Sequence, residues 1–565
     1  MRRFPALVAV LAFLLAAAGL GGAAQARPRA SVAHALIQGS GSSWAANAVN
    51  QWIADVQSNG LQVVFTPSGS AQGRKDFASK TVDFAVSDIG FQGKDPATQA
   101  NDTSQGRNFA YLPIVAGGTA LPYHIEKNGQ LVRNLRLSGD TIAKIFTNKI
   151  KNWNDPQITH DNHGVAMPDL PIIPVVHSEG SGSSYQLTRF LWKEYPQYWN
   201  SFGGNYPTEY FPRQGSQVAE NGSDSSMNFI TSAAANGSIG YDEYSYALGK
   251  NYPVAKVLNK AGYYTLPTQY NVAVALTQAY INMNKSSPDY LLQVLDKVYT
   301  YADQRTYPIS SYSYAIIPTS SNSDNSKMTT AKRQTLADYL YVSICQGQQQ
   351  MGPIGYSPLP VNLVQASFDQ VNKLKQADSK VNLSNESVTT CHNPTFIAGQ
   401  PKANCLAKIA PPPPPCDKDG AGPCTTEASQ KPRGQCVNLN TSTGGGSHPG
   451  TGTGNGPGGG GNGPSGGNTP AGGNDPAGAS NPTATSPVTS PGGVTATNAN
   501  DPLGLGDAAG PAGSNGGAAQ AVAQASTLKR ASSASSDLTL EVLAAALLLG
   551  LIVAPPLIAR RVSRK

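Results

Sequence analysis

Residues 172–185 read Ile-Ile-Pro-Val-Val-His-Ser-Glu-Gly-Ser-Gly-Ser-Ser-Tyr. The apolar first half predicts a short buried strand over 172–176, and the Gly/Ser loop after it opens a helix that runs through Leu187, Phe190 and Leu191. Earlier stretches repeat this order of strand, small polar loop and helix. Such alternation is typical of a mostly parallel sheet with helices on both faces, so the sequence predicts an α/β fold.

Three other loops share the small polar composition of residues 179–184. They lie at 39–43 before a predicted helix over 45–57, at 68–73 after a predicted strand over 61–65, and at 87–88 after one over 83–86. Open α/β sheets bind their ligands at such corners, and unpaired N–H groups at a helix start attract an oxyanion. An ordinary helix cap is the simpler explanation for any one loop. Four such loops in one chain favour a binding site.

The composition argues against several other functions. The chain of 565 residues has a formal net charge of +7, mostly from basic residues near its two ends. The remainder is close to neutral and lacks the basic stripe of a nucleic-acid-binding protein. No G-x-S-x-G motif occurs before the Gly-rich residues 441–536, no Walker A or H-E-x-x-H motif occurs in the chain, and the seven histidines form no ligand-spaced cluster. We therefore expect no enzyme activity, no metal site, no cofactor and no nucleic-acid partner.

The two ends predict export and anchoring. Arg2-Arg3, an apolar run over 7–20 and Ala24-Gln25-Ala26 predict a signal peptide over 1–26, with an uncleaved N-terminal anchor as the alternative. Residues 538–559 are apolar enough to predict one transmembrane helix, and the basic residues of 560–565 place the C-terminus in the cytoplasm. We expect a single-pass protein whose body lies at the extracellular face of the cell membrane.

The region before the predicted anchor divides into two parts. Residues 441–536 are rich in Gly, Pro, Ser and Thr, which predicts a disordered linker. Residues 376–440 contain most of the cysteines and a run of prolines, which predicts a small cross-linked stalk. An even number of cysteines in an exported chain favours disulfides, although the sequence does not choose among fifteen pairings. The six are Cys345, Cys391, Cys405, Cys416, Cys424 and Cys436.

Several longer motifs lie between residues 36 and 371. They include Gly39-Ser-Gly-Ser-Ser-Trp44, Ser68-Gly-Ser70 with Gly73-Arg74, Val82-Asp-Phe-Ala-Val-Ser-Asp88, Glu179-Gly-Ser-Gly-Ser-Ser-Tyr185, Gly237-Ser-Ile-Gly-Tyr241 and Gly355-Tyr-Ser-Pro-Leu-Pro360. Through these motifs the chain resembles the phosphate-binding proteins that serve ABC-type phosphate importers. The resemblance implies a two-lobed type II periplasmic-binding-protein fold over 31–375. Lobe 1 would comprise about 31–117 plus 268–375, and lobe 2 about 118–267.

The resemblance also implies a ligand site between the lobes. Its donors would come from three loops: Ser43 and the backbone N–H of Trp44, Ser70, and Ser181, Gly182 and Ser183. Asp88 matches the carboxylate of the family that accepts a hydrogen from the ligand. Phosphate keeps a proton at neutral pH and sulfate does not, so a carboxylate there would leave two acceptors facing each other with sulfate. The alternative for Asp88 is an ordinary cap or turn residue.

One position departs from the family pattern. His177, next to Ser178 and Glu179, stands where the family usually has an Arg paired with an acid. If Glu179 and the ligand keep His177 protonated, the site persists with pH-dependent affinity. Otherwise binding is weaker, the ligand differs, or His177 simply bonds within its loop. Arg74 could compensate in part, but the sequence favours a solvated side chain there.

These observations predict extracellular binding of inorganic phosphate for delivery to the membrane permease of an ABC-type importer. The alternative is a surface-anchored interaction or sensing protein that reuses the solute-binding fold, possibly for another oxyanion. The linker suits both hypotheses, so the site residues have to discriminate between them.

Overall fold

The computed structural model describes residues 33–321, 327–388, 391–397, 399–400, 403–424 and 432–436. The predicted signal peptide, linker, transmembrane helix and basic tail all lie outside these residues. Among the residues described, no helix combines the length and the apolar character needed to span a bilayer.

A six-stranded sheet forms the core of the first lobe. Its order is β13-β6-β18-β3-β1-β2, in which β1 pairs in parallel with both β2 and β3, while β18 runs antiparallel between β3 and β6. The strands span Ile37–Gly41 (β1), Val63–Thr66 (β2), Phe84–Ser87 (β3), Phe109–Ala120 (β6), Asp242–Glu243 (β13) and Ser310–Pro318 (β18). The predicted α/β class is confirmed, and the predicted strands over 61–65 and 83–86 are present as β2 and β3. The sheet is mixed because β18 runs antiparallel to both β3 and β6.

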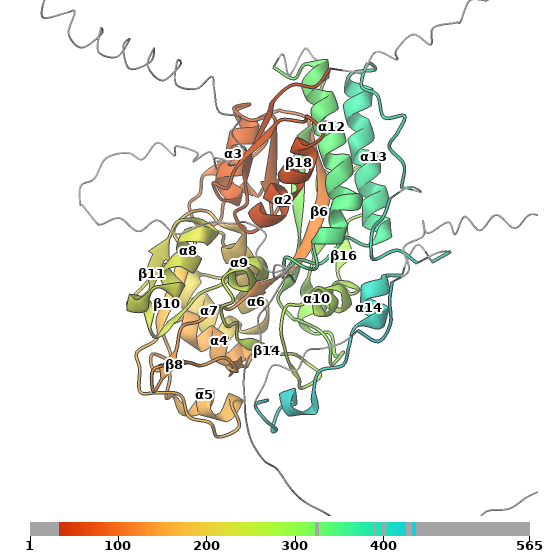
Figure 1. Ribbon diagram of the computed structural model, residues 1–565. Helices are drawn as coiled ribbons and strands as arrows, with labels where there is room; N and C mark the ends of the chain where they lie inside the picture. Colours follow the sequence, from red (N-terminus) through yellow and green to blue (C-terminus); the bar gives the residue numbers. More distant parts are fainter. Residues whose placement is uncertain are drawn as a thin grey trace, which may run out of the picture. The chain divides into compact units, whose positions relative to one another are not determined.

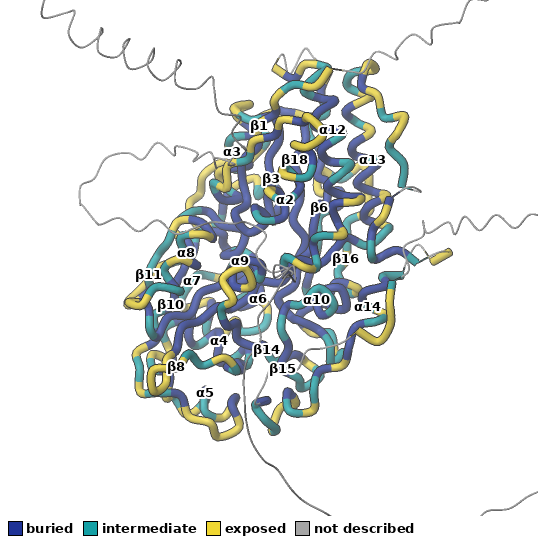
Figure 2. Tube along the Cα trace, in the orientation of Figure 1, coloured by how far each residue is buried: buried dark blue, intermediate teal, exposed yellow. Residues whose placement is uncertain are grey.

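Helices cover this sheet (Figure 1). Helix α3 packs on β1 and β3, helix α13 packs on β6, and α12 packs against α2 and α13. Strands β6 and β18 are buried along almost their whole length (Figure 2). The helices span Ala46–Gln57 (α2), Ser70–Ala78 (α3), Thr330–Ile344 (α12) and Val361–Ala377 (α13).

The second lobe is built around β10, which lies in parallel between β11 and β12. A second small sheet has the order β15-β14-β9. The strands span Ile173–His177 (β10), Val218–Glu220 (β11), Ser238–Ile239 (β12), Arg136–Leu137 (β9), Lys256–Leu258 (β14) and Tyr264–Thr265 (β15). The helices span Gly139–Phe146 (α4), Pro156–Asp161 (α5), Gly182–Glu194 (α6), Pro196–Gly203 (α7), Gly222–Thr231 (α8) and Tyr244–Gly249 (α9). The predicted strand and helix around residues 172–185 are confirmed as β10 and α6.

The remaining elements are short. They are Gly93–Lys94 (β4), Asn101–Asp102 (β5), Glu126–Lys127 (β7), Gln130–Leu131 (β8), Tyr280–Ile281 (β16), Gln293–Val294 (β17), Gln269–Leu276 (α10), Asp296–Tyr299 (α11) and Cys405–Ile409 (α14), with 3₁₀ turns at Ala233–Ala235, Gln346–Gln350 and Pro415–Asp417. The two lobes are joined where β6 ends, because Thr119 and Ala120 pair with β13, a strand that lies between the second-lobe elements β12 and α9 in the chain. The chain re-enters the first lobe just before α10.

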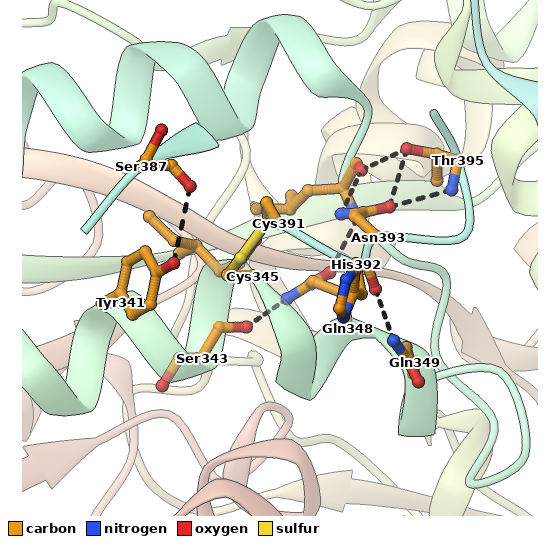
Figure 3. The surroundings of a disulfide bond; sticks show 12 residues. Tyr341, Ser343, Cys345, Gln348, Gln349, Ser387, Cys391, His392, Asn393 and Thr395 are labelled. Carbon is orange, nitrogen blue, oxygen red and sulfur yellow. Dashed lines mark hydrogen bonds between the residues drawn. A yellow bond between two sulfur atoms is a disulfide. The ribbon is translucent and has the colours of Figure 1, made fainter. Parts of the chain in front are cut away.

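The six cysteines form three disulfides, and one of these lies within the loop that another closes. The disulfides are Cys345–Cys391, Cys405–Cys436 and Cys416–Cys424. Around the first of them, Asn393 and Thr395 both donate to the carbonyl of Leu359, which fixes the segment after Cys391 on the body (Figure 3).

The segment that carries the other two disulfides is docked on the body as well. Helix α14 packs on α10. Arg136 of β9 donates through Nη1 to the carbonyls of Cys416 and Ala421 at 3.0 and 2.6 Å. Lys256 of β14 places Nζ 2.8 Å from Asp417 Oδ2, and both residues are buried. The described part of the predicted stalk therefore lies on the body. Hydrogen bonds and an ion pair between buried groups of the stalk and of the second lobe hold it there.

We expect Asp417→Asn to destabilise the protein by about 3–5 kcal/mol, because it leaves the Lys256 ammonium buried without its carboxylate. Urea unfolding at neutral pH measures this loss. Asp419→Asn is the matched control, since Asp419 lies on the same segment and the Lys256 ammonium contacts Asp417 instead. Equal stability of the two variants would show that the Lys256–Asp417 pair does not hold the segment in place.

Candidate functional site

Asp88 lies at the centre of the loops that the sequence singles out. It follows β3 directly and is 1% exposed. Ser42 Oγ donates to Asp88 Oδ2 at 2.7 Å, and Ser70 Oγ donates to the same oxygen at 3.1 Å. The three first-lobe corners therefore converge on one carboxylate, with Ser42 as the contact from the first of them, while the role of Ser43 as a ligand donor stays a prediction.

The second lobe contacts the same carboxylate through the start of α6. A Cβ atom added at Gly182 would come within 1.9 Å of Asp88 Oδ2, so only glycine allows this approach. Gln186, one turn further along α6, donates through Nε2 to the Asp88 carbonyl at 3.2 Å. The loop before α6 touches α3 as well, since the N–H of Ala71 donates to the carbonyl of Gly180 at 3.0 Å. The two lobes thus meet at Asp88.

Four helices begin around this cluster without a side-chain cap. They are α2, α3, α6 and α8. By contrast, α4, α5 and α10 are capped by Ser138, Asp155 and Thr268. The first N–H groups of a helix have no partner inside the helix, so the absence of caps leaves the positive ends of four helix dipoles facing one region.

Several buried side-chain atoms in this region have no hydrogen-bond partner of normal geometry among the described residues. They include the acceptor Asp88 Oδ1 and two hydroxyl oxygens, Ser183 Oγ and Ser313 Oγ. Burial raises the pKa of Asp88, while the nearby hydroxyls of Ser313, Ser42 and Ser70 and the charge of Arg74 oppose that rise. The site therefore combines helix N–H groups and hydroxyl donors with one carboxylate oxygen that still needs a donor.

His177 ends β10 and is held between two carboxylates. Its Nδ1 lies 2.8 Å from Glu179 Oε1, and its Nε2 lies 3.5 Å from Asp242 Oδ2. Burial alone would lower the pKa of His177, but the hydrogen bond and charge of Glu179, together with Asp242, raise it to about 9. The same pair lowers the pKa of Glu179 against the effect of its burial. His177 is thus a cation at neutral pH, paired with an acid as in the family pattern.

Ser43 connects the first-lobe loop to α8. Ser223 Oγ lies 2.9 Å from Ser43 Oγ and donates to Asp242 Oδ1 at 2.8 Å. The hydroxyl of Tyr246 donates to the Ser43 carbonyl at 2.6 Å. Sequence analysis missed Ser223 and Asp242. The signal for Ser223 was present, because Asn221-Gly222-Ser223 is a fifth small polar corner between a strand and a helix.

The structure buries Trp44 beside this loop. Its carbonyl accepts from the Tyr356 hydroxyl at 2.6 Å, and the two rings pack edge to face. Ser181 is the residue before α6, and its N–H donates to the carbonyl of Glu209 at 2.9 Å. The Ser181 N–H is therefore bonded to a protein carbonyl, and the roles of Ser181 and of the Trp44 N–H as ligand donors stay predictions.

The prediction that Arg74 is solvated is wrong. Its side chain is fully buried, and Nη2 pairs with Asp102 at 2.8 Å and with Glu209 of the second lobe. Burial alone would lower its pKa, but the charges of Glu209 and Asp102 raise it. The sequence held the reason, since Ser70, Arg74 and Phe77 share one helical face that α3 turns inward. Among the described residues, no group of His, Cys, Asp and Glu side chains is arranged to hold a metal ion.

A family model described as a PBP superfamily domain matches residues 23–343. The chain is 30% identical over 332 residues to phosphate-binding protein PstS 2 of Mycobacterium tuberculosis, covering 57% of this chain and 83% of that protein. It is 27% identical over 329 residues to phosphate-binding protein PstS of Xylella fastidiosa, covering 58% and 82%. A solved phosphate-binding protein from Stenotrophomonas maltophilia aligns at 18% identity with a TM-score of 0.45, covering 60% of this chain and 94% of that one.

The raised pKa of His177 predicts a pH-dependent stability. Because the folded pKa of about 9 exceeds the ordinary 6.5, the stabilisation is complete below pH 6.5 and is lost as the pH rises through 9. We expect His177→Gln to abolish a contribution of about 3 kcal/mol at pH 6 and to lose much less at pH 9. Urea unfolding at both pH values measures it. His160→Gln, at an exposed imidazole, should change neither value. An equal loss for His177→Gln at both pH values would contradict the charged pair.

Proposed function

The chain belongs to the PBP superfamily, in the family of the PstS phosphate-binding proteins, and we propose that it binds inorganic phosphate between its two lobes. The observation that carries this proposal is that the uncapped N-termini of α3 and α6, from different lobes, meet at Asp88 beside the serine loop that leads into α2. A tetrahedral anion needs many donors from different directions, and helix N-termini with serine hydroxyls supply them without adding bulk. On this proposal Ser43, the Trp44 N–H, Ser70, Gly182 and Ser183 donate to the anion.

Asp88 gives the proposed site its preference for phosphate over sulfate. Its Oδ1 is buried and has no donor among the described residues. A ligand that carries a hydrogen satisfies this oxygen, whereas a fully ionised ligand places an acceptor against it. The cost of two buried acceptors facing each other is about 1–3 kcal/mol or more. The charge of His177 offsets part of the repulsion between Asp88 and the anion.

We further propose the cellular setting that the termini suggest. A signal peptide over 1–26 exports the chain, a linker over 441–536 carries the body away from the membrane, and a helix over 538–559 anchors it with a cytoplasmic tail. The body then delivers phosphate to the permease of an ABC-type importer and performs no catalysis itself. A surface protein without a transport role has no need for a buried carboxylate among uncapped helices, so we do not favour that alternative.

Isothermal titration of the purified chain with phosphate, arsenate and sulfate tests the proposal. We expect phosphate and arsenate to bind and sulfate to bind at least tenfold more weakly, because about 1.4 kcal/mol already corresponds to tenfold. In Asp88→Asn the amide can donate, so the preference over sulfate should shrink. Undiminished selectivity in Asp88→Asn would remove the role of Asp88. Absence of phosphate binding at every pH from 5 to 8 would overturn the proposed function.

Gly182→Ala tests the geometry of the site. The added methyl group would meet the Asp88 carboxylate at 1.9 Å, so either α6 or Asp88 has to move. We expect at least a hundredfold loss of phosphate affinity with the fold retained, because alanine is a good helix former. Gly249→Ala is the matched control, since a Cβ there meets nothing within 4 Å. Equal phosphate affinity in the two variants would place the ligand elsewhere.

A further inference from the structure

A second buried carboxylate lies beside the proposed phosphate site. Asp242 is 2% exposed and lies on β13, next to the point where β6 enters the second lobe. Its Oδ1 accepts from Ser223 Oγ and from the N–H of Glu243, both at 2.8 Å. Its Oδ2 makes no hydrogen bond of normal geometry among the described residues. The carboxylate of Asp242 therefore resembles that of Asp88. In each, one oxygen accepts a hydrogen bond from a serine hydroxyl and the other has no hydrogen-bond donor of normal geometry among the described residues.

The two carboxylates flank the same serine corner. Asp88 accepts from Ser42, and Asp242 is reached from the adjacent Ser43 through Ser223. This corner is the start of α2, from which the proposed site draws donors. The hydroxyl of Ser223 therefore links Asp242 to Ser43, which we propose as a donor to the ligand.

The charges around this corner do not balance. His177 is the cation nearest to Asp242, and it is shared between Asp242 and Glu179. Arg74 is paired with Asp102 and Glu209. The buried carboxyl groups of Asp88, Asp242 and Glu243 and the partly buried Glu179 therefore lie around this corner, and His177 contacts only Glu179 and Asp242. Burial raises the pKa of Glu243 well above its usual value, and Asp242 raises it further. An entering oxyanion adds negative charge to a poorly screened site, and that repulsion disfavours the ionised form of any carboxyl group that can take a proton.

We propose that Asp242 is a carboxyl group beside the phosphate site that takes up a proton when phosphate binds. This inference rests on the proposed function. The proton comes from solvent and adds to the free oxygen of the carboxylate, and no covalent bond to phosphate forms. Phosphate capture by this chain is then coupled to proton uptake.

The surroundings of Asp242 favour protonation there. Burial raises the pKa of Asp242 to about 6, against the opposing effects of His177 and of the Ser223 and Glu243 hydrogen bonds, while Glu179 raises it further. Tyr246 of α9 and Tyr241 also interact with this carboxylate, and both remain neutral in the physiological range because burial raises the pKa of each. A bound anion raises the pKa of Asp242 above its ligand-free value, so binding near pH 7.5 takes up a proton.

Titration calorimetry of the full chain with inorganic phosphate at pH 7.5, in buffers of different ionisation enthalpy, counts the protons taken up. We expect Asp242→Asn to take up about one proton fewer than the wild type, and its affinity to vary less steeply with pH between 6 and 8. Asp242→Glu should restore the uptake. Asp224→Asn, an acid in the first turn of α8 beside Ser223, should match the wild type.

The outcomes separate the two proposals. A wild-type chain that binds phosphate with the same proton count as Asp242→Asn overturns the inference and leaves the proposed function standing. A wild-type chain that does not bind phosphate overturns both. If Asp242→Asn does not fold, Asp242→Glu and the wild type still test the inference. Proton uptake predicts that the phosphate affinity of the wild type increases as the pH is lowered from 8 to 6, and an affinity that does not increase contradicts it.

Discussion

A carboxylate buried against the amino ends of helices from two lobes constrains the whole structure. Asp88 repels an anion by its charge, and the helices around it attract one. The arrangement is favourable only where the backbone can approach closely, which explains glycine at position 182 and serines at the surrounding corners. It also requires that the lobes meet, and β6, Arg74 and Glu209 hold them at that distance.

Much of this fold could be predicted from local patterns. The strand before residues 177–181 follows from an apolar run, and the helix after them follows from the helical spacing of apolar residues. The corners at Ser70 and Asp88 follow from their small polar residues. The contact of Ser42 with Asp88 was not predicted, for a physical reason. Adjacent residues in a loop point in different directions, and composition does not record which one faces the carboxylate.

Other features depend on contacts between distant segments, which a single sequence does not encode locally. Asp242 is close to His177 only because β13 joins the edge of the first-lobe sheet. Predicting the burial of Arg74 would have required two steps. One was to see that it lies on the inner face of α3, and the other was to identify its partners Asp102 and Glu209, which lie far apart in the chain. The disulfide pairing and the docking of the segment around Asp417 likewise follow from tertiary contacts and not from cysteine spacing.

The docked segment has a mechanical consequence. Cys436, among the last residues described, is covalently joined to Cys405 at the start of α14. Any pull exerted on the chain beyond Cys436 is therefore carried by that bond into α14 and α10, and onward through the Lys256–Asp417 pair. Tension along the polypeptide therefore first reaches the body at α10, a helix that supplies none of the residues proposed for the phosphate site.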